Sequence, residues 1–140
     1  MDVKVAKSLD EFAKAVIIRY KVFVVEQCFS EDIEIDEHEA SATHLIAVDG
    51  GKVVGTARVY KEGQDVRLGR MAVEKQWRGK GVGRALVAAA KVEAKKIRGN
   101  YLVAHAQVQA LEFYEKMGLK KAGEPYIEDG APHVIVRCKL

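Results

Sequence analysis

Apolar residues recur at helical spacing near the start of the chain, between residues 8 and 25. Ser8 and Glu11 form the Ser-x-x-Glu pattern of a helix N-terminus, in which side chains cap the first turn. The apolar positions that follow at three- and four-residue spacing are Phe12, Val16, Tyr20 and Phe23. These features predict an amphipathic helix, preceded by a short strand at residues 3–5.

Three strands are predicted in the middle of the sequence, at residues 44–48, 52–60 and 66–73. The first two are joined by Asp49-Gly50-Gly51, a strong signal for a tight hairpin. A second turn at Glu62-Gly63-Gln64 leads into the third strand. Strands joined in sequence by short turns predict an antiparallel meander.

The buried face changes within the third of these strands. Val66 and Leu68 share one parity, whereas Met71 and Val73 have the opposite one. A β-bulge produces such a one-residue slip. Because a bulge also separates a strand from its neighbour, we expect unpaired backbone groups here that a ligand can bind.

The second half of the chain alternates helices and strands. Small apolar residues at helical spacing predict a helix over residues 82–98, followed by a strand at 101–106, a short helix at 109–117 and a final strand at 133–139. The strand-helix-strand crossover implies local parallel pairing. We therefore expect an α/β fold formed by one domain over residues 1–140. Its sheet should be mixed and mostly antiparallel, flanked by helices, with a bulged central strand splayed from its neighbour.

Composition narrows the classes of function. The chain has 140 residues and a net charge of +3, without the strongly basic stripe that is typical of nucleic-acid binding. No stretch is apolar enough for a signal peptide or a membrane span. Cys28 and Cys138 fit no metal or redox spacing and are expected to be reduced thiols. We therefore expect a cytoplasmic protein with no metal, no nucleic-acid partner and no membrane contact.

A glycine-rich turn lies between the third strand and the long helix, at residues 76–84. Glycines at alternate positions allow positive φ values and close approach of the backbone to a ligand. The helix that begins there presents unpaired N–H groups and the positive end of its dipole, so the turn can cradle phosphate. The alternative is a solvated strand-to-helix turn with basic residues. The residues expected to bind an anionic cofactor are Arg78, Gly79, Lys80, Gly81, Val82, Gly83 and Arg84.

The spacing Gln76-x-x-Gly79-x-Gly81 fits neither the Rossmann turn nor the P-loop. It resembles the pyrophosphate-binding motif of the GNAT superfamily of acyl-CoA-dependent N-acetyltransferases. The segment Phe113-Tyr114-Glu115-Lys116-Met117-Gly118-Leu119 resembles a second GNAT motif, one helix and one strand further along the chain. The segments that resemble the ElaA/YjcF-like branch of the family are residues 19–27, 34–37 and 129–133.

This resemblance implies acetyl-CoA as the co-substrate. The backbone of Met71, Ala72 and Val73 would pair with the pantetheine arm, and an N–H there would polarise the thioester carbonyl. Tyr114 would protonate the leaving thiolate, the alternative being a core aromatic side chain. Gln107 stands where many family members have an asparagine, and its longer side chain would contact pantetheine or the acid.

Transfer to an amine also needs a group that takes a proton from it. The candidates are Glu26, His44 and His133, and for the two histidines the alternative is a surface position at a strand end. For Glu26 the alternative is an ion pair with Arg19. His105 alternates with two alanines of a buried strand and is expected to be a packed histidine.

Arg58 and Arg70 are expected to lie opposite each other across the predicted hairpin. Two like charges in this position need a nearby anion. This is either a carboxylate or phosphate of the acceptor or an acidic side chain from residues 29–42. We expect that acidic segment to be a solvated loop, the alternative being the rim of a site for a cationic group. Arg19 and Glu26 are further candidates for contact with the acceptor.

The sequence thus predicts an enzyme that moves an acetyl group directly from acetyl-CoA to the amine of a small molecule. One rival interpretation is a catalytically silent CoA-binding sensor or regulatory domain. Another is a nucleic-acid-binding module that uses the basic helix. The sequence does not determine the oligomeric state, and a homodimer is one of the states that it allows.

Overall fold

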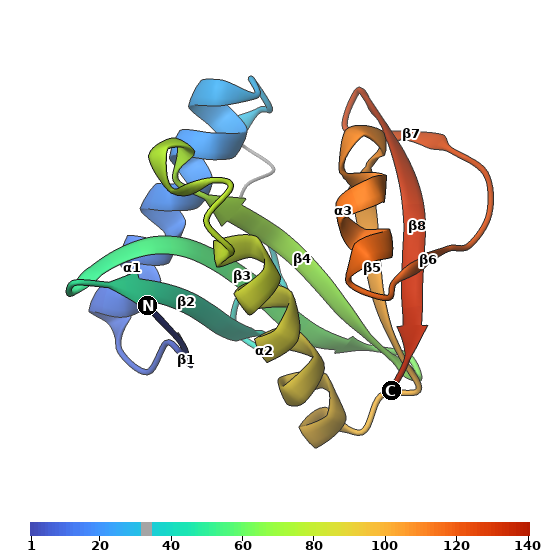
Figure 1. Ribbon diagram of the computed structural model, residues 1–140, viewed down its shortest axis with the longest axis horizontal. Coiled ribbons are helices and arrows are strands. Elements are labelled where there is room, and N and C mark those ends of the chain that lie inside the picture. The colour runs from blue at the N-terminus through green and yellow to red at the C-terminus, as the bar shows by residue number, and fades with distance from the viewer. Residues whose placement is uncertain (32–34) are drawn as a thin grey trace.

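The computed structural model describes residues 1–31 and 35–140, and within them eight strands form one mixed sheet (Figure 1). The strand order is β1-β2-β3-β4-β5-β8-β6, and β7 also pairs with β8. Asp32 and Glu34 of the predicted acidic loop lie outside the described residues.

The strands are β1 (Asp2–Val5), β2 (Thr43–Asp49), β3 (Lys52–Glu62), β4 (Asp65–Val73), β5 (Tyr101–Gln107), β6 (Lys120–Lys121), β7 (Tyr126–Glu128) and β8 (Ala131–Lys139). The helices are α1 (Leu9–Arg19), the π-helix η1 (Tyr20–Glu26), α2 (Val82–Ile97) and α3 (Leu111–Lys116), with 3-10 turns η3 (Lys75–Trp77) and η4 (Val108–Ala110). The predicted α/β class with a mixed, mostly antiparallel sheet is confirmed.

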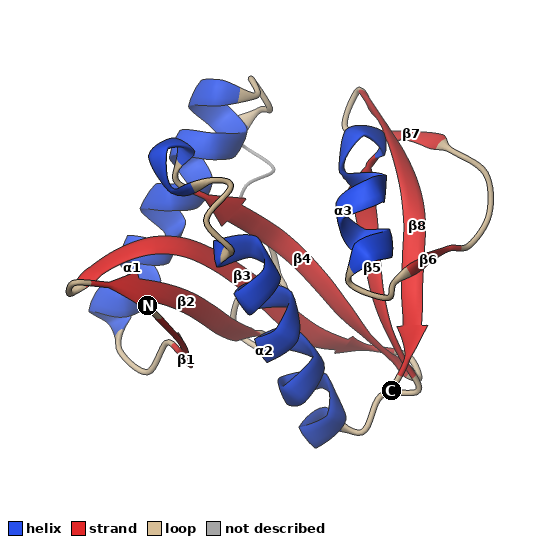
Figure 2. Cartoon of the chain, in the orientation of Figure 1, coloured by secondary structure: helices blue, strands red, loops and turns tan. Residues whose placement is uncertain are grey.

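Helices cover both faces of the sheet (Figure 2). On one face α2 contributes fully buried side chains, Leu86 and Ala90 among them, to the larger core cluster. On the other face Ile18 of α1 and Val22 of η1 pack with Ala72 of β4. The described helices all lack the length and apolar character needed to cross a membrane. The end of β4 therefore lies between the two helical layers.

The predicted N-terminal helix is confirmed, but its second part is wider than an α-helix. Ser8 caps α1 by accepting a hydrogen bond of 3.1 Å from the backbone N–H of Glu11. The carboxylate of Glu11 accepts from the N–H of Lys7 at 2.9 Å. From Tyr20 to Glu26 the backbone forms a π-helix, which the spacing of apolar residues does not distinguish from an α-helix. Such π segments are frequent at functional sites.

β4 separates from β5 part-way along its length. The two strands pair in parallel only between residues 66–68 and residues 102–104. On its other side β4 continues to pair with β3, through a bulge in which Arg70 adopts a left-handed φ of 47°. Beyond the bulge Met71 and Val73 pack on the same core cluster as the strand's first half, as their parity predicts. The splayed, bulged strand is confirmed, and residues 69–73 have no described partner strand on the β5 side (Figure 1).

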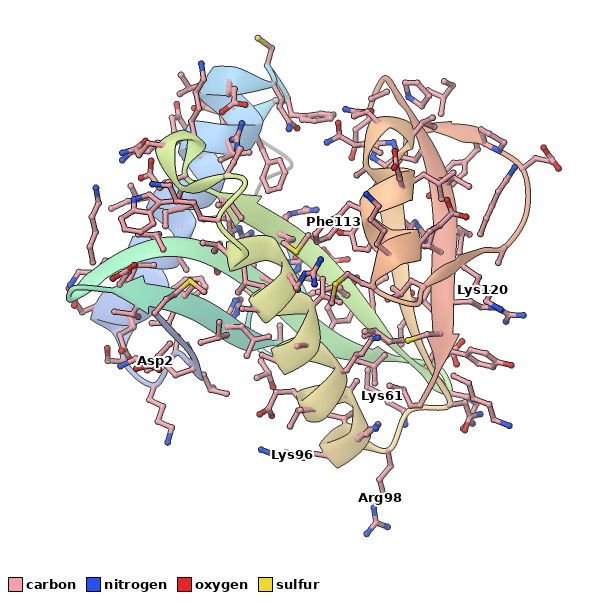
Figure 3. All side chains as sticks on the ribbon, in the orientation of Figure 1. Asp2, Lys61, Lys96, Arg98, Phe113 and Lys120 are labelled. Atoms are coloured by element: carbon pink, nitrogen blue, oxygen red, sulfur yellow. The ribbon has the colours of Figure 1, made fainter. Side chains whose placement is uncertain are left out.

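Glycines fix the position of α2. A Cβ on Gly55 of β3 would lie 2.8 Å from Cγ1 of Val82, so a glycine lets the first turn of α2 approach the sheet this closely. The helix predicted over residues 82–98 ends at Arg98, which takes the left-handed conformation, with φ 66° and a side chain that points away from the molecule (Figure 3). The next residue, Gly99, packs closely on β4, because a Cβ there would lie 2.5 Å from Cγ2 of Val66.

Buried ion pairs attach residues 35–42 to the sheet. Arg58, which is 3% exposed, donates two hydrogen bonds of 2.7 Å to the carboxylate of Asp36, and Arg70 contacts that carboxylate at 3.2 Å. Arg19, which is 1% exposed, pairs at 2.7 Å with Glu39, which also lies 3.0 Å from Arg58. The hydrogen bonds from Arg58 hold the pKa of Asp36 well below its usual range.

Two expectations about these charges are wrong. Asp36 and Glu39 are ion-paired to arginines of α1 and the sheet, whereas a solvated loop was expected. Arg58 lies opposite Gly69, and not opposite Arg70, because the hairpin turn pairs Glu62 with Asp65 and this register continues unchanged to Arg58. The anion shared by the two arginines is the protein's own Asp36.

Replacing Gly55 by alanine tests the close approach of α2. We expect Gly55→Ala to lower the free energy of unfolding by about 1–3 kcal/mol, because the added methyl group overpacks the contact with Val82. Urea unfolding measures this, with Gly69→Ala as the control, since a Cβ at Gly69 meets only one atom, at 4.0 Å. Equal stability of the two variants would contradict the account.

Replacing Asp36 by asparagine tests the ion pairs. The folded-state pKa of Asp36 is lowered, so its contribution to stability is complete above the ordinary aspartate pKa of about 3.9 and is lost as the pH falls below it. We expect Asp36→Asn to cost about 3 kcal/mol at pH 7 and progressively less under acid conditions. Urea unfolding across pH measures the difference, with exposed Asp2→Asn as the control. A loss that does not depend on pH would argue against the pairing.

Candidate active site

Two adjoining hollows follow the separation of β4 from β5. The first, here called the glycine-loop groove, has a volume of about 570 Å³ and extends from the end of β4 to the first turn of α2. The second, the inner cavity, has a volume of about 260 Å³ and lies between β4, β5, β8 and the chain around η1. Gln27, Met71 and Ala110 line both, so the two hollows meet.

The glycine-loop groove brings together most of the residues that the sequence predicts for cofactor binding. Gly79 and Gly81 have φ values of 75° and 87°, which favour glycine, and no atom lies within 4 Å of where their Cβ would be. Their backbone is therefore accessible at the positive end of α2. Lys80 places its ammonium 5.2 Å from the centre of the Trp77 ring. The predicted residues that line the groove are Met71, Ala72, Val73, Arg78, Gly79, Gly81, Val82, Gly83 and Arg84.

A carboxylate at the end of η1 holds Arg78. The guanidinium donates to the two carboxylate oxygens of Glu26 at 2.6 and 2.8 Å, and its Nε donates to the carbonyl of Val73 at 3.0 Å. The hydrogen bond from Arg78 lowers the pKa of Glu26. The sequence suggested a pair between Glu26 and Arg19, but Arg19 pairs with Glu39. Glu26 thus braces the glycine loop, and neither it nor Arg19 belongs to the described lining of the inner cavity.

Tyr114 reaches the inner cavity from the core side. It is 7% exposed, belongs to the larger core cluster and also lines the cavity. Burial raises the pKa of Tyr114 to about 12, so the phenol keeps its proton at neutral pH. The neighbouring Phe113 packs edge-on against Tyr114 and contacts Gly83 at the start of α2, which joins α3 to the glycine loop (Figure 3). Tyr114 is therefore a core side chain and also a protonated group at the cavity, as the two interpretations of it require.

Three glutamines form a chain beside the cavity. Nε2 of Gln107 donates to Oε1 of Gln27 at 2.8 Å, and Nε2 of Gln109 donates to Oε1 of Gln107 at 2.6 Å. All three line the inner cavity. Gln107 thereby ties the end of β5 to the chain that follows η1, across the separation of the strands.

His105 is not the packed histidine that the sequence predicts. Its side chain is 22% exposed and lines the inner cavity. Ala104 and Ala106 face the core, as the strand alternation predicts. On the opposite face of β5, the side chains of Tyr126 and Glu128 reach His105 from β7, which pairs with β8, and His105 lines the cavity beside them.

A cluster of polar side chains surrounds His105. Its Nδ1 lies 3.0 Å from Oε1 of Glu128 and 2.8 Å from the hydroxyl of Tyr126, which donates to the same carboxylate oxygen at 3.1 Å. Burial favours a higher pKa for Glu128, but the hydrogen bonds from His105 and Tyr126 and the charges of the nearby histidines together outweigh it, and the pKa lies below its usual value. Burial, together with the charge of Glu128, raises the pKa of Tyr126 to about 12. The sequence signal for this cluster is the alternation Tyr126-x-Glu128 before the Asp129-Gly130 turn.

The other candidate residues are divided between the cavity and the core. His133 of β8 lines the cavity, and its Nδ1 donates to the carbonyl of Ala131 at 2.8 Å. Arg70 also lines it. His44 lies away from it, with Nε2 3.0 Å from the backbone carbonyl of Glu39, and Arg58 is buried in the ion pairs described above.

Comparison with known proteins identifies the family. A model for the acetyltransferase (GNAT) domain matches residues 8–140. YjcF of Bacillus subtilis (strain 168), an uncharacterized N-acetyltransferase, is 33% identical over 135 residues, which cover 96% of each chain. Protein ElaA of Escherichia coli (strain K12) is 32% identical over 124 residues, 84% of this chain and 80% of its own. The crystal structure of a candidate N-acetyltransferase from Lactobacillus plantarum has a TM-score of 0.90 at 30% identity, covering 99% of this chain and 97% of that one. This chain therefore belongs to the GNAT family, with ElaA and YjcF among its relatives, and is an N-acetyltransferase whose co-substrate is acetyl-CoA.

Proposed function

We propose that this enzyme transfers the acetyl group of acetyl-CoA directly to the amine of a small molecule. The observation that carries the proposal is the continuity of the two hollows. The glycine-loop groove, suited to a pyrophosphate, meets a smaller cavity that holds a protonated tyrosine. An extended cofactor can bind in the groove with its thioester at the cavity. Residues 1–140 would form one catalytic domain, and its free thiols Cys28 and Cys138 suit a reducing compartment such as the cytoplasm.

The cofactor would bind through backbone groups. Residues 71–73 of β4 lie beyond the last pair with β5, so the pantetheine arm can pair with this edge of β4 as an added strand would. Amides from Arg78 through Arg84 would bind the pyrophosphate at the N-terminus of α2. Gln107, fixed by its two glutamine neighbours, would border the arm near the sulfur.

The reaction needs an amine, a polarised carbonyl and a proton for the sulfur. The amine nitrogen attacks the thioester carbon, whose oxygen accepts a hydrogen bond from an N–H of β4. As the C–S bond breaks, Tyr114 gives its proton to the sulfur and later regains one from solvent. A phenol with a pKa of about 12 is a weaker acid than a thiol, whose pKa is about 8.5, so the proton must move while the bond is breaking.

The inner cavity sets limits on the acceptor. Its volume of about 260 Å³ suits a small molecule or the end of a side chain. Of the residues proposed from sequence to contact the acceptor, Arg70 lines this cavity, with its guanidinium 3.2 Å from Asp36. We propose that Arg70 presents positive charge to the acceptor, whereas Arg19 and Arg58 organise the structure around it.

Replacing Tyr114 by phenylalanine tests the acid. We expect Tyr114→Phe to lower kcat by about 10²-fold or more, with little change in the Kd for CoA, because the ring still fills its site. Release of the CoA thiol measures turnover, and calorimetry measures CoA affinity. The control is Tyr101→Phe, since Tyr101 stacks under Arg137 away from both hollows. An unchanged kcat would assign the proton to another group or to water.

Replacing Gly81 by glutamate tests the phosphate site. We expect Gly81→Glu to abolish measurable CoA binding, because it adds negative charge beside the pyrophosphate and a Cβ at a φ of 87°. Gly63→Glu is the matched control, because Gly63 also has a positive φ, 63°, but lies in the β3–β4 turn. Calorimetric titration with CoA distinguishes the two variants. Normal binding by Gly81→Glu would place the phosphates elsewhere.

A further inference from the structure

We infer that His105, held by Glu128 and Tyr126, is the general base that takes the proton from the acceptor amine. The inference rests on the proposed function, because it assumes that the acceptor amine enters the inner cavity. Nothing in the family comparison assigns a role to these three residues, and the sequence pattern alone suggested a packed histidine.

The position of His105 follows from the separation of the strands. The last pair between β4 and β5 is Leu68 with Ala104, so His105 is the first residue of β5 beyond the junction. It faces away from the core, while Tyr114 approaches the cavity from the core side. The two side chains therefore reach one cavity from opposite faces of β5. This arrangement suits a reaction that removes a proton from nitrogen and supplies one to sulfur.

The contacts of His105 select one tautomer. The carboxylate of Glu128 lies 3.0 Å from Nδ1, and two lone pairs at that distance would repel each other, so Nδ1 carries the proton and donates it to Glu128. Tyr126 donates its own proton to the same carboxylate at 3.1 Å. Nε2 then keeps its lone pair, and it has no hydrogen-bond partner within residues 1–31 and 35–140. A carboxylate on Nδ1 also stabilises the imidazolium that forms when Nε2 accepts a proton.

His133 is the nearest competitor, and its surroundings fit the role less well. Its Nδ1 proton is used by the carbonyl of Ala131, so its Nε2 also has a lone pair. That atom lies 3.9 Å from Oε2 of Glu128, and the side chain is only 8% exposed, against 22% for His105. The lone pair of His133 is thus next to a carboxylate and largely closed off from an entering amine.

The proton transfer balances without any further reactant. The amine nitrogen forms a bond to the thioester carbon and loses a proton to Nε2 of His105. The C–S bond breaks, and the sulfur takes a proton from Tyr114. The imidazolium then gives its proton to solvent, from which Tyr114 recovers one. The products are the N-acetyl amine and CoA in its thiol form.

The expected pH dependence arises from protonation of Nε2, which removes the base. The charged or titratable groups around His105 are Glu128 and Tyr126 of β7, Asp129 in the following turn, His133 of β8, Tyr114 of α3 and Arg67 and Arg70 of β4. Of these, Glu128 and Tyr126 contact the ring at Nδ1, and Glu128, which accepts the Nδ1 proton, is the positioning residue. We expect kcat/KM to fall as the pH is lowered, because an imidazolium cannot accept the proton of the amine.

The test uses the full-length enzyme, acetyl-CoA and a panel of aliphatic, aromatic and amino-acid-like primary amines. The amine that gives the wild-type enzyme its highest rate is then used to record pH profiles of CoA thiol release. We expect His105→Gln to lower kcat/KM by about 10²-fold at pH 7, with an unchanged Kd for CoA. We also expect it to remove the acid limb, which is the fall of kcat/KM at low pH in the wild-type profile. We expect Glu128→Gln to keep the acid limb and shift it to lower pH, because the imidazolium loses its carboxylate. His38→Gln is the matched control, since His38 stacks on Tyr60 outside both hollows.

The outcomes separate the inference from the proposed function. A wild-type enzyme that binds CoA but acetylates none of the amines would contradict the small-molecule acceptor, and the inference with it. The other case is a wild-type enzyme that acetylates an amine. The inference alone is then overturned by an acid limb that persists in His105→Gln, or by one that disappears only in His133→Gln. Nitrogen-15 NMR of histidine in the wild-type enzyme gives a check that needs no variant. We expect His105 to carry its neutral-state proton on Nδ1, and a proton on Nε2 would overturn the assignment.

Discussion

The separation of β4 from β5 beyond Leu68 and Ala104 is the constraint on which the rest of the site depends. The bulge at Arg70, with its left-handed φ of 47°, turns the second half of β4 while β3 still holds its other edge. Backbone N–H and C=O groups freed in this way need partners, which water or a ligand must supply. The same separation creates both hollows, and Gly55 lets α2 begin beside them. A backbone defect thus determines where a cofactor can bind.

Local patterns in the sequence predicted the parts of the fold that depend on neighbouring residues. The parity change between Leu68 and Met71 predicted the bulge, and the Gly79-x-Gly81 spacing predicted the groove. Where distant segments meet, the patterns failed. Alternation placed His105 on the correct side of β5 but gave no sign that β7, more than twenty residues later, would form the wall beside it. The acidic residues after η1 looked solvated because their partners, Arg19 and Arg58, lie on other elements.

Charge is distributed so that structural and chemical roles are separate. Arg19 and Arg58 are buried and neutralised by Glu39 and Asp36, which fixes the chain after η1 against the sheet. Glu26 similarly neutralises the guanidinium of Arg78 beside the glycine loop. The inner cavity, in contrast, contains groups that can exchange protons. Tyr114 stands on one face of β5 and the proposed base, His105, on the other.

The most direct measurement is a crystal structure of the enzyme with CoA, because the site depends on where the cofactor binds relative to the separation of β4 and β5. We expect pyrophosphate on the amides of residues 78–84, pantetheine along residues 71–73 of β4, and the sulfur in the cavity between Tyr114 and His105. CoA bound outside the separation of β4 and β5, or with its sulfur directed away from that cavity, would contradict this expectation.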